Sequence, residues 1–322
     1  MRIIYNFGSL LYDFGNSNFI FVDLHPTSSL RTLPREDVGA DLLSVHLARE
    51  FKSKAIITML PRDHEFGMDL NRLPPPENLA LKMFEPFLKL EKNKTVEFEK
   101  KYAWVASSKD EHLKKEEIYK RFWLTLDKIS DSNSIFIFIH AQSLGLKNFP
   151  SLVDVVPLKG FKENKIESVI RLLNKKWEKQ FTKLKKDFLE CLIFHTKHIW
   201  KSFVQQTMGS LDPKTYKGSI REHYEKMLNR IRELGFKKEY EILRDTYSLE
   251  NHVEVIKKIV PKVPLQITLM KNFSGKFALA SKKFLKNKKW GIEFEVNTFL
   301  SEIYPNLGRD ILKELIEEIT ST

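Results

Sequence analysis

Residues 55–60, Ala55-Ile56-Ile57-Thr58-Met59-Leu60, form a run of apolar and β-branched side chains that predicts a buried strand. A charged turn follows this run, and then come Asp69-Leu70-Asn71-Arg72 and the three prolines Pro74–Pro76. Because proline fixes φ and has no backbone N–H, the prolines end any helix or sheet at this point. The stretch therefore predicts a strand that leads into a loop carrying Asn71 and Arg72, an amide and a guanidinium that together suit a carboxylate ligand.

Other strands on either side of this stretch predict the fold class. Residues 18–24 are rich in β-forming side chains, and residues 135–139 are apolar without alternation, which is typical of a central strand buried on both faces. Amphipathic or strongly helical segments at 40–51 and 110–128 separate these strands. The order β-loop-α-β-loop-α-β predicts a three-layer α/β protein with a mixed central sheet.

The pattern of the sequence changes from strand-like to helical between about residues 162 and 258, where charged helical segments dominate. We expect an α/β core at 1–161 and 262–322, and a helical insertion or cap at 162–261. The other expected elements are strands at 1–5, 265–269, 276–279 and 290–297, an extended segment at 95–105, and helices at 77–89, 166–188, 190–206, 219–234, 250–259 and 308–319.

Composition narrows the class of protein. The chain has 322 residues, of which 42% are hydrophobic and 30% charged, as in soluble globular proteins. Its apolar runs are too short to span a bilayer, and no signal peptide is evident. The single cysteine, Cys191, excludes an internal disulfide and favours a cytoplasmic protein with no membrane partner. Abundant lysine and glutamate resemble thermophile, archaeal-like usage.

The net charge of +12 attracts polyanions whether or not binding them is the function. A genome-wide preference for lysine explains the same charge. No familiar nucleic-acid recognition motif accompanies it, so a nucleic-acid partner is the less favoured interpretation.

Four candidate chemical groups lie at the ends of predicted strands or just beyond. They are His25, the acidic pair Glu36 and Asp37, His140, and Glu295 on the late strand. Two histidines and one carboxylate are a common set of ligands for a catalytic zinc ion, with a further carboxylate as general base. Taken singly, each histidine is better explained as a strand-end residue bonded to backbone, and Glu295 as part of a solvated strand face. Only their joint placement favours a metal site.

The order His25, Asp37, Asp69-Leu70-Asn71-Arg72, His112, His140-x-x-Ser143 and Glu293-Phe294-Glu295-Val296-Asn297 resembles that of the N-formylglutamate amidohydrolase family. Members of this family are related in fold to zinc carboxypeptidases, which implies a carboxypeptidase-like (phosphorylase/hydrolase-like) core. The resemblance covers residues 18–150 and 265–303.

The resemblance implies one Zn²⁺ ion held by His25, Asp37 (or Glu36) and His140. It implies that Asn71 and Arg72 bind the substrate carboxylate or the developing oxyanion, and that Glu295 is the general base. Arg62 and His64 in the preceding loop, and His112 at a helix start, are further candidates for substrate contact.

A second constellation is Cys191, His195 and His198, which share one face of a predicted helix and could form a soft-metal site. Apolar residues are interleaved with them, and packing is the favoured explanation.

The sequence thus predicts a zinc-dependent hydrolase that cleaves an amide near a carboxylate, in an N-formyl- or N-acyl-amino acid or a small peptide. The alternative is a nucleic-acid-associated or interaction protein on a degenerate hydrolase scaffold.

Overall fold

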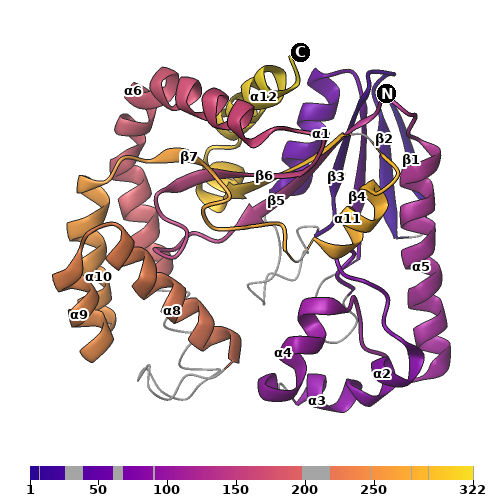
Figure 1. Cartoon of the computed structure of the whole chain (residues 1–322), viewed down its shortest axis with the longest axis horizontal. Coiled ribbons are helices and arrows are strands. Elements are labelled where there is room, and N and C mark those ends of the chain that lie inside the picture. Colours follow the sequence, from indigo (N-terminus) through magenta and orange to yellow (C-terminus); the bar gives the residue numbers. More distant parts are fainter. Residues whose placement is uncertain are drawn as a thin grey trace. The chain divides into compact units, whose positions relative to one another are not determined.

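The computed structural model describes residues 1–6, 8–25, 39–60, 68–89, 91–197, 218–246, 248–276, 278–288 and 290–321. Its strands form one mixed sheet in the order β1-β2-β4-β3-β5-β8-β6-β7 (Figure 1). They are β1 Arg2–Asn6, β2 Ser9–Asp13, β3 Phe19–Asp23, β4 Lys54–Thr58, β5 Ile135–Gln142, β6 Ser151–Lys159, β7 Gln266–Leu269 and β8 Trp290–Asn297.

Helices flank this sheet (Figure 1), so the predicted α/β class with a mixed central sheet is confirmed. The α-helices are α1 Ala40–Glu50, α2 Glu77–Lys82, α3 Phe84–Leu88, α4 Lys92–Lys101, α5 Lys109–Lys128, α6 Glu163–His195, α8 Gly218–Glu233, α9 Lys237–Asp245, α10 Leu249–Ile259, α11 Leu279–Leu285 and α12 Pro305–Thr320. Short helical turns, at Val260–Lys262 and Phe299–Ile303, connect some of them.

The central strands β4, β3, β5 and β8 run parallel to one another, and β1 and β2 extend the sheet antiparallel on the β4 side. One face of β3 and β5 contributes to a buried core with apolar side chains of α5 and α11. Helix α1 contacts β3, β4 and β5 and also α12. Because parallel strands end at the same edge of a sheet, the segments that follow β3, β4 and β5 are brought to one edge.

The chain divides into two compact units. Unit 1 comprises residues 1–142, 154–170 and 269–322, and unit 2 comprises residues 143–153 and 171–268. Unit 2 contains most of α6 and all of α8, α9 and α10. The expected insertion at 162–261 falls largely within unit 2.

Several local predictions are wrong, and each error has a physical reason. An extended segment is expected at 95–105, yet Lys92–Lys101 is helical. Phe98 of this helix is buried against Met83 and Val105, so tertiary packing overrides the intrinsic preference. The strand expected at 276–279 is absent from its described residues, and α11 begins at Leu279.

Other elements were not anticipated. The segment between β1 and β3, for which no strand was predicted, contains β2, which forms a hairpin with β1 where Gly8 adopts a φ of 79°. Strand β6 was not predicted at all. Two separate helices were expected at 166–188 and 190–206. The structure instead has one continuous helix of 33 residues, α6, which extends from Glu163 to His195.

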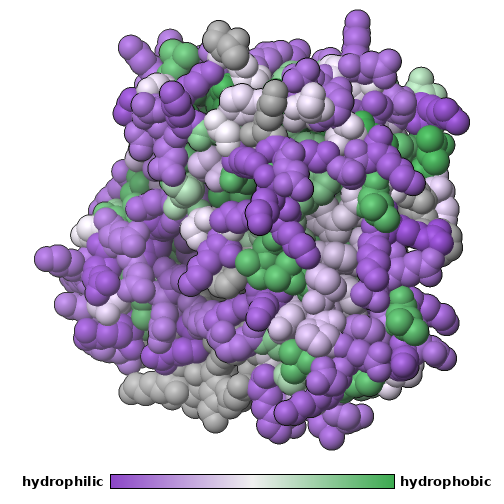
Figure 2. Space-filling view, turned by 45° about the vertical axis from the view of Figure 1, so that its right-hand side comes forward, coloured by the Kyte–Doolittle hydropathy of each residue, from purple (hydrophilic) through white to green (hydrophobic). Residues whose placement is uncertain are grey.

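None of the helices in these ranges is long and apolar enough to cross a membrane. The face of the molecule in Figure 2 is mainly hydrophilic, with hydrophobic side chains in small separate groups.

Candidate metal centre

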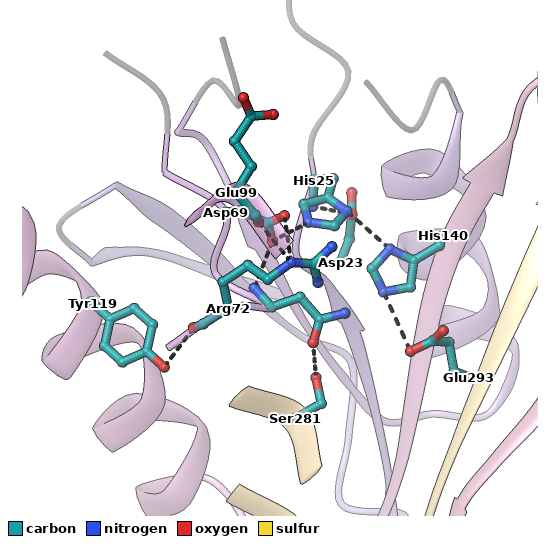
Figure 3. Close-up of polar contacts among 10 residues, drawn as sticks. Asp23, His25, Asp69, Arg72, Glu99, Tyr119, His140, Ser281 and Glu293 are labelled. Atoms are coloured by element: carbon teal, nitrogen blue, oxygen red, sulfur yellow. Dashed lines mark hydrogen bonds and ion pairs between the residues drawn. The ribbon is translucent and has the colours of Figure 1, made fainter. Parts of the chain in front are cut away.

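Two histidines from neighbouring parallel strands meet at the carboxyl edge of the sheet. β3 and β5 pair in register from Phe19 with Ile135 to Val22 with Phe138. His25 lies two residues beyond β3, and His140 lies near the end of β5. Their rings come together with Nδ1 3.1 Å from Nδ1, and both side chains are buried (Figure 3).

Each imidazole directs its other nitrogen toward a carboxylate. His25 Nε2 is 2.9 Å from Asp69 Oδ1, and His140 Nε2 is 3.9 Å from Glu293 Oε2 (Figure 3). The Asp69 carboxylate accepts only, so its hydrogen bond with His25 favours the tautomer whose proton is on Nε2. Glu293 is beyond hydrogen-bond distance of His140 and favours the same tautomer there through its charge. In that tautomer the two Nδ1 atoms present lone pairs to each other, and a cation or a shared proton between them relieves the repulsion.

This arrangement fits zinc. With Zn–N distances of about 2.0–2.1 Å and tetrahedral angles, two ligand nitrogens are about 3.3 Å apart, close to the 3.1 Å between the two Nδ1 atoms. In zinc sites, the ring nitrogen of a histidine that does not bind the metal commonly faces a carboxylate, as Nε2 does in both histidines here. In the described ranges, no group of three or more His, Cys, Asp or Glu side chains forms a metal site. The expected third ligand, Asp37 or Glu36, lies outside the described residues.

Asp69 joins the histidine pair to the Asn71-Arg72 loop. Its Oδ1 also accepts the backbone N–H of Asn71 at 2.9 Å, and its Oδ2 lies 3.7 Å from Arg72 Nε. Its own N–H donates to the backbone oxygen of Ala103 at 2.8 Å, which anchors the loop. Within the Asp69-Leu70-Asn71-Arg72 motif, only Asn71 and Arg72 were expected to bind a ligand, so the role of Asp69 emerges from the structure alone.

Asn71 is held by α11, a helix that the sequence analysis did not predict. The Ser281 hydroxyl donates to Asn71 Oδ1 at 2.7 Å, and the Ala280 N–H donates to Asn71 O at 3.1 Å (Figure 3 labels Ser281). Asn71 and Ser281 are both buried. Because the amide oxygen faces Ser281, the Nδ2 donor of Asn71 is directed away from it.

Arg72 is fixed from both its ends. Its Nε donates to the backbone oxygen of Glu99 at 3.3 Å, and its own backbone oxygen accepts from the Tyr119 hydroxyl at 3.0 Å (Figure 3). Burial raises the pKa of the Tyr119 phenol, so this hydroxyl remains a donor. The guanidinium is only 13% exposed and lies near the Asp69 carboxylate.

Both glutamates of β8 lie on the His140 face of the sheet. Glu295 pairs in register with His140, and Glu293 pairs with Phe138 two residues earlier. Glu293 and Glu295 are buried, as are the apolar residues on the other face of β8, so this strand has no solvated face at the glutamates. Glu293, which the sequence analysis left without a role, makes the ion pair with His140.

The ends of β5 and β8 are linked by a further network. Gln142 Nε2 donates to the backbone oxygen of Glu295 at 3.1 Å, and Asn272 Nδ2 donates to Gln142 Oε1 at 3.0 Å. The buried Asp154 on β6 accepts three successive backbone N–H groups at 271–273, at 2.8–3.0 Å. This network restrains the segment that leads from β7 to α11.

His112 occupies an aromatic cluster at the start of α5. Trp104 Nε1 donates to its Nδ1 at 3.2 Å, so the neutral ring carries its proton on Nε2. The Trp104 ring also contacts Tyr119, whose hydroxyl holds Arg72. His112 is thus linked to the Arg72 loop through aromatic packing.

The remaining candidates are Arg62, His64 and the second constellation. Arg62 and His64 lie outside the described residues, as does His198 of the second constellation. Burial, with Asp187 and Glu190 nearby, raises the pKa of the Cys191 thiol, which disfavours the thiolate that binds soft metals.

Comparison with family models, with curated proteins and with solved structures finds no match to this chain. Interpretation of the centre therefore depends on its geometry and on the chemistry of its side chains.

Proposed function

We propose that this protein is a zinc-dependent hydrolase that cleaves an amide bond near a carboxylate, in an N-acyl-amino acid or a small peptide. The observation that carries the proposal is the pair of Nδ1 atoms 3.1 Å apart, with a carboxylate facing each Nε2. Two imidazoles whose Nε2 atoms face carboxylates can supply their two Nδ1 atoms as ligands of one tetrahedral zinc ion.

His25 and His140 would hold the metal together with Asp37 or Glu36. A zinc ion at such a site lowers the pKa of a bound water toward neutrality and polarises a carbonyl group. Asp69 would fix the tautomer and ring orientation of His25 through its hydrogen bond, and the charge of Glu293 would favour the same tautomer of His140. Without them the Nδ1 lone pairs would not converge.

The substrate carboxylate would be held by neighbouring residues of one loop. Arg72 supplies a guanidinium, and Asn71 supplies the Nδ2 donor that Ser281 turns away from α11. Because Asp69 contacts His25, Asn71 and Arg72, it couples the carboxylate-binding loop to the metal ligands. An amide close to the carboxylate is the bond that this arrangement would place at the metal.

Glu295 would be the general base and then the proton donor to the leaving amine. The register that pairs Glu295 with His140 supports this role because it puts the two side chains on one face of adjacent strands.

The test is zinc content and uptake of the purified protein. One zinc ion per chain is expected in the wild-type protein, and a loss of bound zinc in His25→Ala and in His140→Ala. His46→Ala, an exposed histidine on α1, is the matched control and should keep its zinc. Wild-type protein that takes up no zinc, or alanine variants that keep it with unchanged affinity, would refute the proposal.

A further inference from the structure

The positive charge of the chain is concentrated in one of its two units. Unit 2 contains 22 Lys and Arg against 12 Asp and Glu. Its net charge of +10 therefore accounts for most of the chain's net charge of +12. Unit 1 contains 32 Lys and Arg against 30 Asp and Glu and is nearly neutral. A general preference for lysine would enrich both units, so the charge is a specific property of unit 2.

Helix α6 carries the densest part of this charge. Between Arg171 and Lys186 there are seven basic residues and one acid, Glu178. Four exposed lysines follow one another at intervals of four, four and three residues; they are Lys175, Lys179, Lys183 and Lys186. At a rise of about 1.5 Å per residue they form a stripe about 16 Å long on one side of the helix.

The protein itself leaves this stripe largely uncompensated. Lys175, Lys179 and Lys183 form no ion pair with any residue that the structure describes, and Lys186 lies 4.0 Å from Glu190. Helix α5 is different, because its six basic residues alternate with five acidic ones and four of them form ion pairs. The lysine stripe, as we name these four residues, therefore presents a net positive field.

The opposite side of α6 decides between classes of polyanion. Phe181, Leu184 and Phe188 are buried in unit 2, and the exposed apolar residues Leu172 and Phe194 lie beyond the two ends of the stripe, so no continuous apolar face accompanies the lysines as in a membrane-surface helix. Within the stripe the aromatic rings are buried or half-buried, and the exposed ring of Phe194 lies eight residues beyond its last lysine, so the lysines have no interleaved platform for the stacking of unpaired bases. What remains is a row of cations at a spacing of about 6 Å, which suits a line of backbone phosphates.

We propose that the lysine stripe of unit 2 binds the phosphate backbone of a nucleic-acid duplex without reading its sequence. Each lysine contacts a phosphate and displaces a condensed counterion, so binding weakens steeply with salt. The inference does not depend on the proposed hydrolase activity, because the stripe lies in unit 2 and the histidine pair in unit 1.

The experiment measures binding of the full-length protein to a short fluorescent DNA duplex over a range of salt concentrations. The probe variant replaces all four lysines of the stripe by glutamine. If each makes one phosphate contact, the slope of log K against log salt becomes shallower by about 3 to 4. The matched control replaces four exposed lysines of α5 by glutamine, namely Lys109, Lys114, Lys120 and Lys128, and should change the slope by less than about 1.

Several results would overturn the proposal. They are wild-type protein that does not bind the duplex at low salt, a slope that is unchanged in the stripe variant, and an equal loss in the α5 variant. Tighter binding of a single strand or of anionic lipid vesicles through the same lysines would assign the stripe to another partner. A duplex of RNA, run in parallel, shows which backbone geometry binds better. Far-UV circular dichroism verifies that both variants are folded, and His140→Ala should bind DNA like the wild-type protein.

Discussion

At the scale of single residues, the candidate centre depends on which carboxylate serves which histidine. Asp69 contacts His25 Nε2 directly, while Glu293 lies 3.9 Å from His140 Nε2. Glu295 pairs with His140 in register but has no part in that ion pair. Two glutamates separated by one residue on the same strand thus have different expected roles, and substitution can separate them.

We predict that Glu293→Gln lowers zinc affinity about 10- to 100-fold, because it removes the charge behind a metal-binding imidazole. Glu295→Gln should keep zinc affinity within about twofold and abolish hydrolysis of an N-acyl-amino acid, since an amide cannot act as the general base. Competition with a chelator measures the first effect, and a turnover assay measures the second. Activity retained in Glu295→Gln would remove this residue from its proposed role.

Ser281 offers a test of the substrate-binding loop. Its hydroxyl sets the orientation of the Asn71 amide, so we predict that Ser281→Ala raises KM about 5- to 10-fold with kcat nearly unchanged, the cost of about one hydrogen bond. Ser44→Ala is the control, because the buried Ser44 hydroxyl has no hydrogen-bond partner in the described part of the chain. An equal effect of both substitutions on KM would contradict the positioning role.

At the scale of secondary structure elements, α5 supports the centre from its first turn. The Ser108 side chain accepts the N–H of Glu111 at 3.2 Å, and the Glu111 carboxylate accepts the N–H of Ser107 at 2.8 Å. Burial acts to raise the pKa of Glu111, but hydrogen bonds from Lys115 and Ser107 outweigh it and lower the pKa below its usual value. The helix that carries His112 and Tyr119 therefore begins at a well-defined residue.

Removing this cap should destabilise the protein. We predict that Ser108→Ala lowers the free energy of unfolding by about 1 kcal/mol, and that Ser108→Asp, which keeps an acceptor at the cap, stays close to the wild-type value. Urea unfolding followed by circular dichroism measures both variants. If Ser108→Asp were as destabilised as Ser108→Ala, the cap hydrogen bond would not be the cause.

Helix α10 contains a buried histidine that makes stability depend on pH. Complete burial lowers the pKa of His252 to about 4, whereas the unfolded chain has the ordinary value of 6.5. Between these two values the unfolded state binds more protons, so stability falls as the pH decreases through this window. The histidine contributes its full stability only above the unfolded pKa.

We therefore predict that the wild-type protein loses about 2 kcal/mol more stability between pH 7 and pH 5 than His252→Leu does. Urea unfolding at the two pH values provides the comparison, with His46→Leu on α1 as the control for an exposed histidine. Equal losses in the wild-type protein and in His252→Leu would show that His252 is protonated in the folded state.

At the scale of the whole molecule, the two units differ in chemistry. The histidine pair, its carboxylates and the Asn71-Arg72 loop all belong to unit 1, and the charge surplus belongs to unit 2. A ligand that binds only the folded state of unit 1 should stabilise that unit by mass action.

We predict that zinc at about 100 times its dissociation constant raises the free energy of unfolding of unit 1 by about 2.7 kcal/mol. Tryptophan fluorescence can follow unit 1 selectively, because Trp104, Trp123 and Trp290 belong to it while Trp177→Phe and Trp200→Phe remove the two in unit 2. The same measurement on His25→Ala should show no stabilisation by zinc. A shift that persists in His25→Ala would place the metal elsewhere.

The sequence by itself determined the α/β class and the main elements of its core. Residues 54–58, 135–142 and 290–297 form strands where their apolar character predicted them, and residues 40–50 and 109–128 form helices. These segments are long or strongly patterned, so local burial decides their structure. The parallel order of the strands then follows from the helices between them, which is why candidate residues at strand ends could be named.

Only the tertiary structure decided which of those residues meet. The pairing of β3 with β5 and of β5 with β8 brings His25, His140 and Glu293 together across more than a hundred residues of chain. No local pattern specifies such contacts, nor those of Asp69 and Ser281, because the register of a sheet depends on its complete set of neighbours. For the same reason β6 and the continuous α6 could not be predicted, since each contacts segments distant in sequence. Helix α4 was missed because Phe98 is buried against Met83 and Val105, a contact that intrinsic preference does not contain.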